Sequence, residues 1–182
     1  TRMRIGVPAE TKDQEYRVGL VPDGVRSLVS AGHEVLVERG AGLGSGLADA
    51  AYEAAGAKLV ATSEAWTQPD LIIKVKEPNA KELTWLREGQ TLFAYLHLAA
   101  NGALVQRLRE SGVIAIAYET MEHADGTLPL LAPMSEVAGR LATQIGVSLL
   151  QKDRGGKGVL IGGIPGVPRG KITVLGAGIV GI

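Results

Sequence analysis

Three side chains that could bind and react with a small anion follow the ends of three predicted strands. Arg17 lies in the loop after a short apolar segment, Lys76 comes directly after the apolar run 71–75, and His97 follows Leu96. In an open α/β sheet, ligands bind outside the carboxyl ends of the strands. A guanidinium and an ammonium attract a carboxylate, and an imidazole can exchange a proton near neutral pH. The three positions therefore predict a pocket for a small organic anion.

Each of these side chains also has a purely structural interpretation. Arg17 could be a solvated loop residue, because arginine side chains are usually exposed. Lys74 and Lys76 share one face of their strand, since side chains alternate with a period of two, and both could be solvated. His97 sits between two leucines and could be a hydrogen-bonded core residue. No two histidines have the spacing of metal ligands, so we expect no metal site.

The segment 171–182 reads K-I-T-V-L-G-A-G-I-V-G-I and has the spacing of a dinucleotide-binding fingerprint. Its β-branched run predicts a strand over residues 172–175, followed by Gly176, Gly178 and Gly181 as G-x-G-x-x-G. The first glycine makes a tight turn, the second lets backbone N–H groups approach a pyrophosphate, and the third packs helix on strand. These glycines therefore predict a bound dinucleotide.

Other glycine-rich segments do not have the spacing of a phosphate site. The loop 40–46 follows a strand, but its glycines alternate, which is typical of a flexible turn. Lys157 follows a glycine but is itself followed by Gly158, where a P-loop needs a hydroxyl to hold Mg²⁺. The acidic residue that holds a ribose hydroxyl is expected about 20 residues after the fingerprint, beyond Ile182, so the choice between NAD and NADP stays open.

The composition excludes several classes of function. The 182 residues carry 19 basic and 19 acidic side chains, so no net charge steers the chain toward nucleic acid or an anionic membrane. There is no cysteine, which excludes disulfides, thiolate metal sites and a cysteine nucleophile. No signal-peptide pattern and no apolar run of membrane-spanning length is present. We therefore expect a cytoplasmic protein without nucleic-acid or membrane partners.

Short apolar runs alternate with segments of helical periodicity up to about residue 117. Strands are predicted over 4–8, 34–38, 58–60, 71–75, 91–96 and 113–117, and helices over 22–31, 49–55, around Glu64, over 80–86 and over 101–110. Such alternation is typical of an open, mostly parallel sheet with helices on both faces, a Rossmann-like α/β fold.

The character of the chain changes at Ser135. Apolar residues keep helical spacing from there to Leu149, and Ser135 is a favourable N-cap. A Gly/Pro-rich stretch then runs to Gly170, which is typical of a connector. We therefore predict a substrate-binding α/β domain over 1–134, a connecting helix and loop over 135–170, and the start of a nucleotide-binding domain over 171–182.

The motifs together resemble a known family. They read R-I-G-V-P-A-E-T-K-D-Q-E-Y-R-V at 4–18, L-I-I-K-V-K-E-P at 71–78, Y-L-H-L-A-A at 95–100, L-P-L-L-A-P-M-S-E-V-A-G-R at 128–140 and G-A-G-I-V-G at 176–181. They are similar to the N-terminal half of the family that holds alanine dehydrogenases and nicotinamide nucleotide transhydrogenase α subunits. Transhydrogenase-like chains typically lack the second lysine and the histidine, so Lys76 and His97 favour the alanine dehydrogenase branch.

The resemblance implies an activity and a set of roles. The reaction is the reversible NAD-dependent oxidative deamination of L-alanine to pyruvate and ammonia. Arg17 and Lys76 would bind the substrate, and His97 would act as general acid/base. Ser135 would contact the nucleotide, although its role as a simple N-cap is an alternative. The family implies a homo-oligomer, commonly a hexamer.

The resemblance also implies a chain about twice as long, with the catalytic aspartate beyond Ile182. We therefore expect the 182 residues alone to be inactive. Two alternatives stay open: a transhydrogenase α-subunit-like domain, and a non-catalytic module that binds a ligand or a partner.

Overall fold

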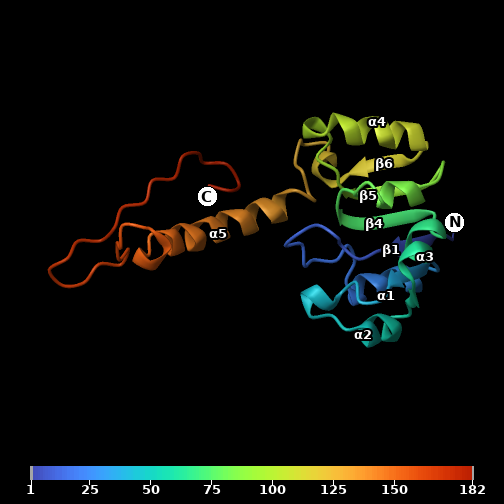
Figure 1. The fold of residues 1–182 in the computed structure, drawn as a ribbon, viewed down its shortest axis with the longest axis horizontal. Helices are drawn as coiled ribbons and strands as arrows, with labels where there is room; N and C mark the ends of the chain where they lie inside the picture. Colours follow the sequence, from blue (N-terminus) through green and yellow to red (C-terminus); the bar gives the residue numbers. More distant parts are fainter. Residues whose placement is uncertain (1, 182) are drawn as a thin grey trace. The chain divides into compact units, whose positions relative to one another are not determined.

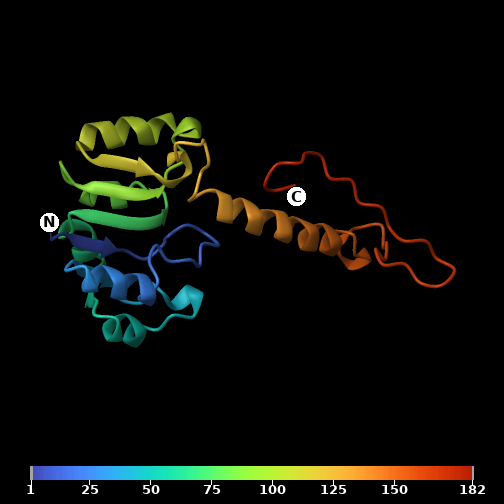
Figure 2. The same cartoon turned by 180° about the vertical axis from the view of Figure 1, so that it is seen from behind.

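The computed structural model describes residues 2–181, which form two compact units, one up to Met121 and the other from Glu122 onward. The first unit is built on six parallel strands in the order β3-β2-β1-β4-β5-β6 (Figures 1 and 2). Their bounds are Arg4–Val7 (β1), Glu34–Glu38 (β2), Lys58–Val60 (β3), Leu71–Lys76 (β4), Thr91–Tyr95 (β5) and Ile114–Ala117 (β6). The predicted open parallel sheet is confirmed.

Helices cover both faces of this sheet, and the sheet separates the core into two clusters. The helices are α1 (Pro22–Ser30), α2 (Asp49–Ala54), α3 (Thr62–Thr67) and α4 (Gly102–Ser111). Ile5 and Val7 of β1 are buried with Tyr52 of α2 in one cluster. The other cluster contains Ile72 of β4 together with Trp66 of α3 and residues of α4. Because successive strand residues point to opposite faces, the two clusters are the two sides of the sheet.

The helix predicted over residues 80–86 is only a short 3₁₀ helix, η2 (Glu82–Trp85). The Asn79 side chain accepts hydrogen bonds from the N–H groups of Lys81 and Glu82, which fixes a tight turn at the start. Leu86 has extended backbone angles and ends the segment. The other 3₁₀ helices are η1 (Leu43–Ser45), η3 (Leu98–Ala100), η4 (Tyr118–Thr120) and η5 (Lys152–Arg154).

The second unit contains the long helix α5 (Ala132–Leu149). This helix begins three residues before the predicted start, with Pro133 in its first turn, where the fixed φ of proline suits a helix and its missing N–H costs nothing. The N-cap is Leu131, and the Ser135 hydroxyl donates to the Leu131 carbonyl at 3.3 Å. The N-cap interpretation of Ser135 is therefore wrong. No helix in the described part of the chain is long and apolar enough to cross a membrane.

Residues 172–175 do not form the predicted strand. Val174 and Leu175 are 62% and 94% exposed. Within the described part of the second unit, the only β-type pairing is a single bridge between Ile164 and Val167. A strand needs a neighbour to receive its N–H and C=O hydrogen bonds, and the segment has none there.

Candidate functional site

The structure brings the predicted anion-binding residues together at the carboxyl edge of the sheet, where β1, β4 and β5 are near neighbours (Figure 1). Lys76 ends β4 and is paired in register with Tyr95 at the end of β5. The Tyr95 ring lies 6.3 Å from the His97 ring, centroid to centroid. The Arg17 guanidinium acts electrostatically on the Tyr95 hydroxyl. Tyr95 therefore lies beside Lys76 and His97 and within the electrostatic field of Arg17.

A bulge at the end of β4 sets the direction of Lys76. Three residue steps of β4, from Ile73 to Lys76, face two steps of β5, and such an insertion re-aims the side chains around it. Lys76 is half-buried, and its ammonium makes no hydrogen bond or ion pair with the described residues. Lys74, by contrast, is only 1% exposed, so the expectation of a solvated side chain is wrong for Lys74.

Arg17 is held in place by Glu15. Its Nε donates to Glu15 Oε1 at 2.8 Å and its Nη2 to Glu15 Oε2 at 2.6 Å. These hydrogen bonds, followed by backbone and charge interactions with Arg17 and the charge of Lys76, outweigh burial and lower the pKa of Glu15. The same hydrogen bonds raise the pKa of Arg17. Arg17 is 45% exposed, and this pairing orients a side chain that would otherwise be a mobile surface arginine.

His97 is not a core residue: its side chain is 48% exposed. Its backbone is left-handed, with φ 49° and ψ 39°, a conformation that is uncommon outside glycine and often found at functional sites. The Glu119 carboxylate holds this backbone by accepting the His97 N–H at 2.6 Å. Nδ1 of the ring lies 3.2 Å from Glu77 Oε2. Of the two ring nitrogens, only Nδ1 has a hydrogen-bond partner among the described residues, which leaves Nε2 available for a further interaction.

Several residues of the site were not predicted from the sequence, above all Tyr95 and the carboxylates Glu15 and Glu77. Burial raises the pKa of Tyr95, while Arg17 opposes the rise and Glu119 adds to it. Burial alone would raise the pKa of Glu77. Hydrogen bonds from Lys12, from its own backbone N–H and from His97 together outweigh burial, so the pKa of Glu77 is lowered. Glu77 directly follows Lys76, and Tyr95 precedes His97 by two residues. Their positions in these two motifs were the available signal.

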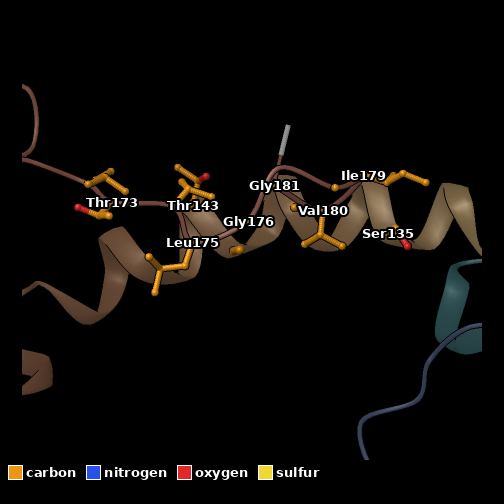
Figure 3. Close-up of a pocket in the computed structure, with 13 residues that line it drawn as sticks. Ser135, Thr143, Thr173, Leu175, Gly176, Ile179, Val180 and Gly181 are labelled. Atoms are coloured by element: carbon orange, nitrogen blue, oxygen red, sulfur yellow. The ribbon is translucent and has the colours of Figure 1, made fainter.

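In the second unit, the predicted nucleotide residues line one cavity of about 660 Å³ (Figure 3). Ser135 lies on α5, and Gly176, Gly178 and Gly181 lie on the segment that runs beside this helix. Gly176 has φ +114°, which L side chains rarely adopt, and the Gly181 N–H donates to the Gly178 carbonyl at 2.9 Å. The glycines of the fingerprint thus form a turn. None of the described residues from Gly176 onward is helical.

A family model described as "Alanine dehydrogenase/PNT, N-terminal domain" matches residues 6–138. The chain belongs to the alanine dehydrogenase/PNT family. A second model of this family, "Alanine dehydrogenase/PNT, C-terminal domain", matches residues 142–182.

Members of the alanine dehydrogenase/PNT family match almost the whole chain. Alanine dehydrogenases of Mycobacterium tuberculosis and Bacillus subtilis are each 55% identical over 98% of the chain, which corresponds to 48% and 47% of those proteins. A solved L-alanine dehydrogenase matches 98% of the chain with a TM-score of 0.93 and 51% identity. The transhydrogenase from Sinorhizobium meliloti matches 75% with a TM-score of 0.69 and 29% identity. The chain thus spans about half the length of the curated relatives it matches.

Proposed function

We propose that the protein containing this chain is an NAD-dependent alanine dehydrogenase, which converts L-alanine and water reversibly to pyruvate and ammonia. The observation that carries this proposal is the joint presence of Lys76, His97 and Arg17 around Tyr95 at one edge of the sheet. Identity of 55% to alanine dehydrogenases supports the same assignment.

In this proposal Arg17 and Lys76 bind the substrate. The ammonium of Lys76 is the cation of the site without an ion pair among the described residues, so a substrate carboxylate or carbonyl oxygen can pair with it directly. The Arg17 guanidinium is oriented by Glu15, and the substrate carboxylate would share it with that side chain.

His97 is proposed to move the proton that accompanies oxidation. When the α carbon of alanine loses a hydride, the nitrogen loses a proton, and later steps move protons on water and ammonia at the same carbon. Nε2 of His97 can accept and return such a proton while Nδ1 remains bonded to Glu77. When bound, NAD would accept the hydride.

Ser135, Gly176, Gly178 and Gly181 are proposed to hold part of the NAD molecule. The glycine conformation at Gly176 and the shared cavity support this role. We also propose the division into a substrate domain over 1–134, a connector over 135–170 and the beginning of a nucleotide domain at 171–182. We also propose that the protein is a cytoplasmic homo-oligomer, commonly a hexamer in this family.

The test is an assay of the full-length gene product. Oxidation of NADH that requires both pyruvate and ammonia supports the proposal. The transhydrogenase relative makes hydride exchange between NADPH and an NAD analogue the informative alternative, and exchange that needs no alanine would replace the dehydrogenase assignment. Calorimetric titration of the 182-residue chain with pyruvate tests whether this part alone retains substrate binding.

A further inference from the structure

Beneath the proposed site lies a buried cluster of three charged side chains. Lys74, Glu10 and Glu82 are 1%, 2% and 3% exposed. The Lys74 ammonium lies 3.3 Å from Glu10 Oε2 and 3.4 Å from Glu82 Oε1. Burying two carboxylates with one ammonium is a poor way to gain stability, because desolvation offsets the attraction. For Glu10, burial outweighs the contribution of Lys74 and raises the pKa of the carboxyl group. The cluster therefore needs another explanation.

Glu10 contacts the bulge that directs Lys76. Its Oε1 accepts the Val75 N–H at 2.7 Å and its Oε2 accepts the Lys76 N–H at 3.2 Å. A bulge leaves backbone groups without partners in the neighbouring strand. Glu10 provides acceptors for two of them with a single carboxylate, so the course of the backbone at Lys76 depends on both oxygens of Glu10.

The same contact anchors the loop that carries Arg17. Residues next to Glu10 are tied to the segment that follows β4: Thr11 donates to Glu82 at 2.9 Å, and Lys12 pairs with Glu77. Further along, Gly19 passes so close to β4 that an added Cβ would lie 2.6 Å from the Ile73 carbonyl oxygen. The loop is thus held against β4 on both sides of Arg17.

We infer that Glu10 is a positioning residue that sets Lys76 against Arg17 for binding of the substrate carboxylate. The inference rests on the proposed function, since it gives Glu10 a task only if Lys76 and Arg17 bind the substrate. Glu10 itself does not reach the ligand. Its two carboxylate oxygens fix the backbone at Val75 and Lys76. Because Glu10 lies at the start of the loop that carries Arg17, the same hydrogen bonds also fix the start of that loop.

The test variant is Glu10→Gln in the full-length protein. An amide keeps the size of the side chain but has one acceptor, and its NH₂ group faces the second backbone N–H. We expect the pyruvate KM to rise by about 10- to 100-fold, the scale expected for a misplaced binding group. Amide hydrogen exchange at Val75 and Lys76 should accelerate. The matched control is Glu38→Gln, because Glu38 also accepts a backbone N–H of this loop, that of Ala9, at 2.8 Å, away from Lys76.

A second variant separates positioning from folding. Glu10→Gln combined with Lys74→Met and Glu82→Gln removes every charge of the Glu10–Lys74–Glu82 cluster, a change that folded proteins tolerate better than removal of one partner. The triple variant should fold and still show the raised KM. A wild-type KM in a folded Glu10→Gln or triple variant, or an equal rise in Glu38→Gln, overturns the inference.

Lys76→Ala in the same assay distinguishes the positioning role of Glu10 from the substrate-binding role of Lys76. If Lys76→Ala leaves the pyruvate KM unchanged, the proposed role of Lys76 in substrate binding fails. If Lys76→Ala raises KM but Glu10→Gln does not, only the positioning role of Glu10 fails.

Discussion

Arg17 and Glu15, two residues apart in one loop, are joined by two parallel hydrogen bonds, Nε to Oε1 at 2.8 Å and Nη2 to Oε2 at 2.6 Å. An internal carboxylate therefore already engages the guanidinium that is proposed to receive a substrate carboxylate. Lys76 also acts on Glu15, so Glu15 lies within the field of both proposed substrate-binding cations.

This pairing predicts an acid-sensitive contribution to stability. The folded-state pKa of Glu15 is below its ordinary value of 4.5, so its contribution is present above that pH and is lost as pH falls through the folded pKa. Urea midpoints measured from about pH 6 to about pH 3 should fall less steeply for Glu15→Gln than for the wild type. Glu53→Gln, at an exposed position of α2, is the control. Parallel pH curves for Glu15→Gln and wild type would contradict the prediction.

Lys76→Ala should weaken substrate binding more than it slows the chemical step. Loss of a charged hydrogen bond of about 1.5–3 kcal/mol raises the pyruvate KM by about 10- to 150-fold, with a smaller change in kcat. Lys58→Ala is the matched control, because Lys58 is an exposed lysine on β3 that pairs with Glu34 at 2.6 Å. Steady-state kinetics of the full-length protein measure both. An unchanged pyruvate KM in Lys76→Ala would show that Lys76 is a solvated lysine that does not bind the substrate.

His97 is best replaced by asparagine, because asparagine tolerates the left-handed backbone at this position better than alanine. If His97 moves a proton, kcat of His97→Asn should fall by about 10²- to 10⁴-fold while the pyruvate dissociation constant changes little. His123→Asn, at an exposed position of the second unit, should behave like wild type. Wild-type kcat in His97→Asn would show that the histidine has a structural role only.

The glycine turn predicts a selective effect on the nucleotide. A Cβ at Gly181 would collide with the Gly176 carbonyl oxygen, and Gly176 has φ +114°. Alanine at either position forces backbone strain of about 1–3 kcal/mol, so the KM for NADH of the full-length protein should rise while that for pyruvate stays near wild type. Gly162→Ala is the control, because an added Cβ there meets open space. Equal NADH kinetics in all three variants would remove the turn from the nucleotide site.

The order of strands and helices in the first unit could be predicted because it depends on local patterns. Apolar runs bounded by glycine and proline predict strands. Residues at their ends or in the loops that follow, such as Lys76, His97 and Arg17, meet because parallel strands end at one edge. In the second unit the same reasoning failed at residues 172–175 and at Ser135. A strand requires a partner that its own sequence does not contain. The helix α5 begins at Ala132, with Pro133 in its first turn, so Ser135 lies inside the helix instead of capping it.

The sequence by itself determined the α/β fold, the motifs of the alanine dehydrogenase/PNT family and the chemistry available at the ends of the strands. Only the tertiary structure decided what surrounds each charge. Lys74 and Lys76 are indistinguishable by pattern, yet Lys74 is buried against Glu10, which lies in the loop after β1, whereas Lys76 remains without an ion pair among the described residues. Partners so far apart in sequence are fixed by the packing of the loop on β4, and no local periodicity records that contact.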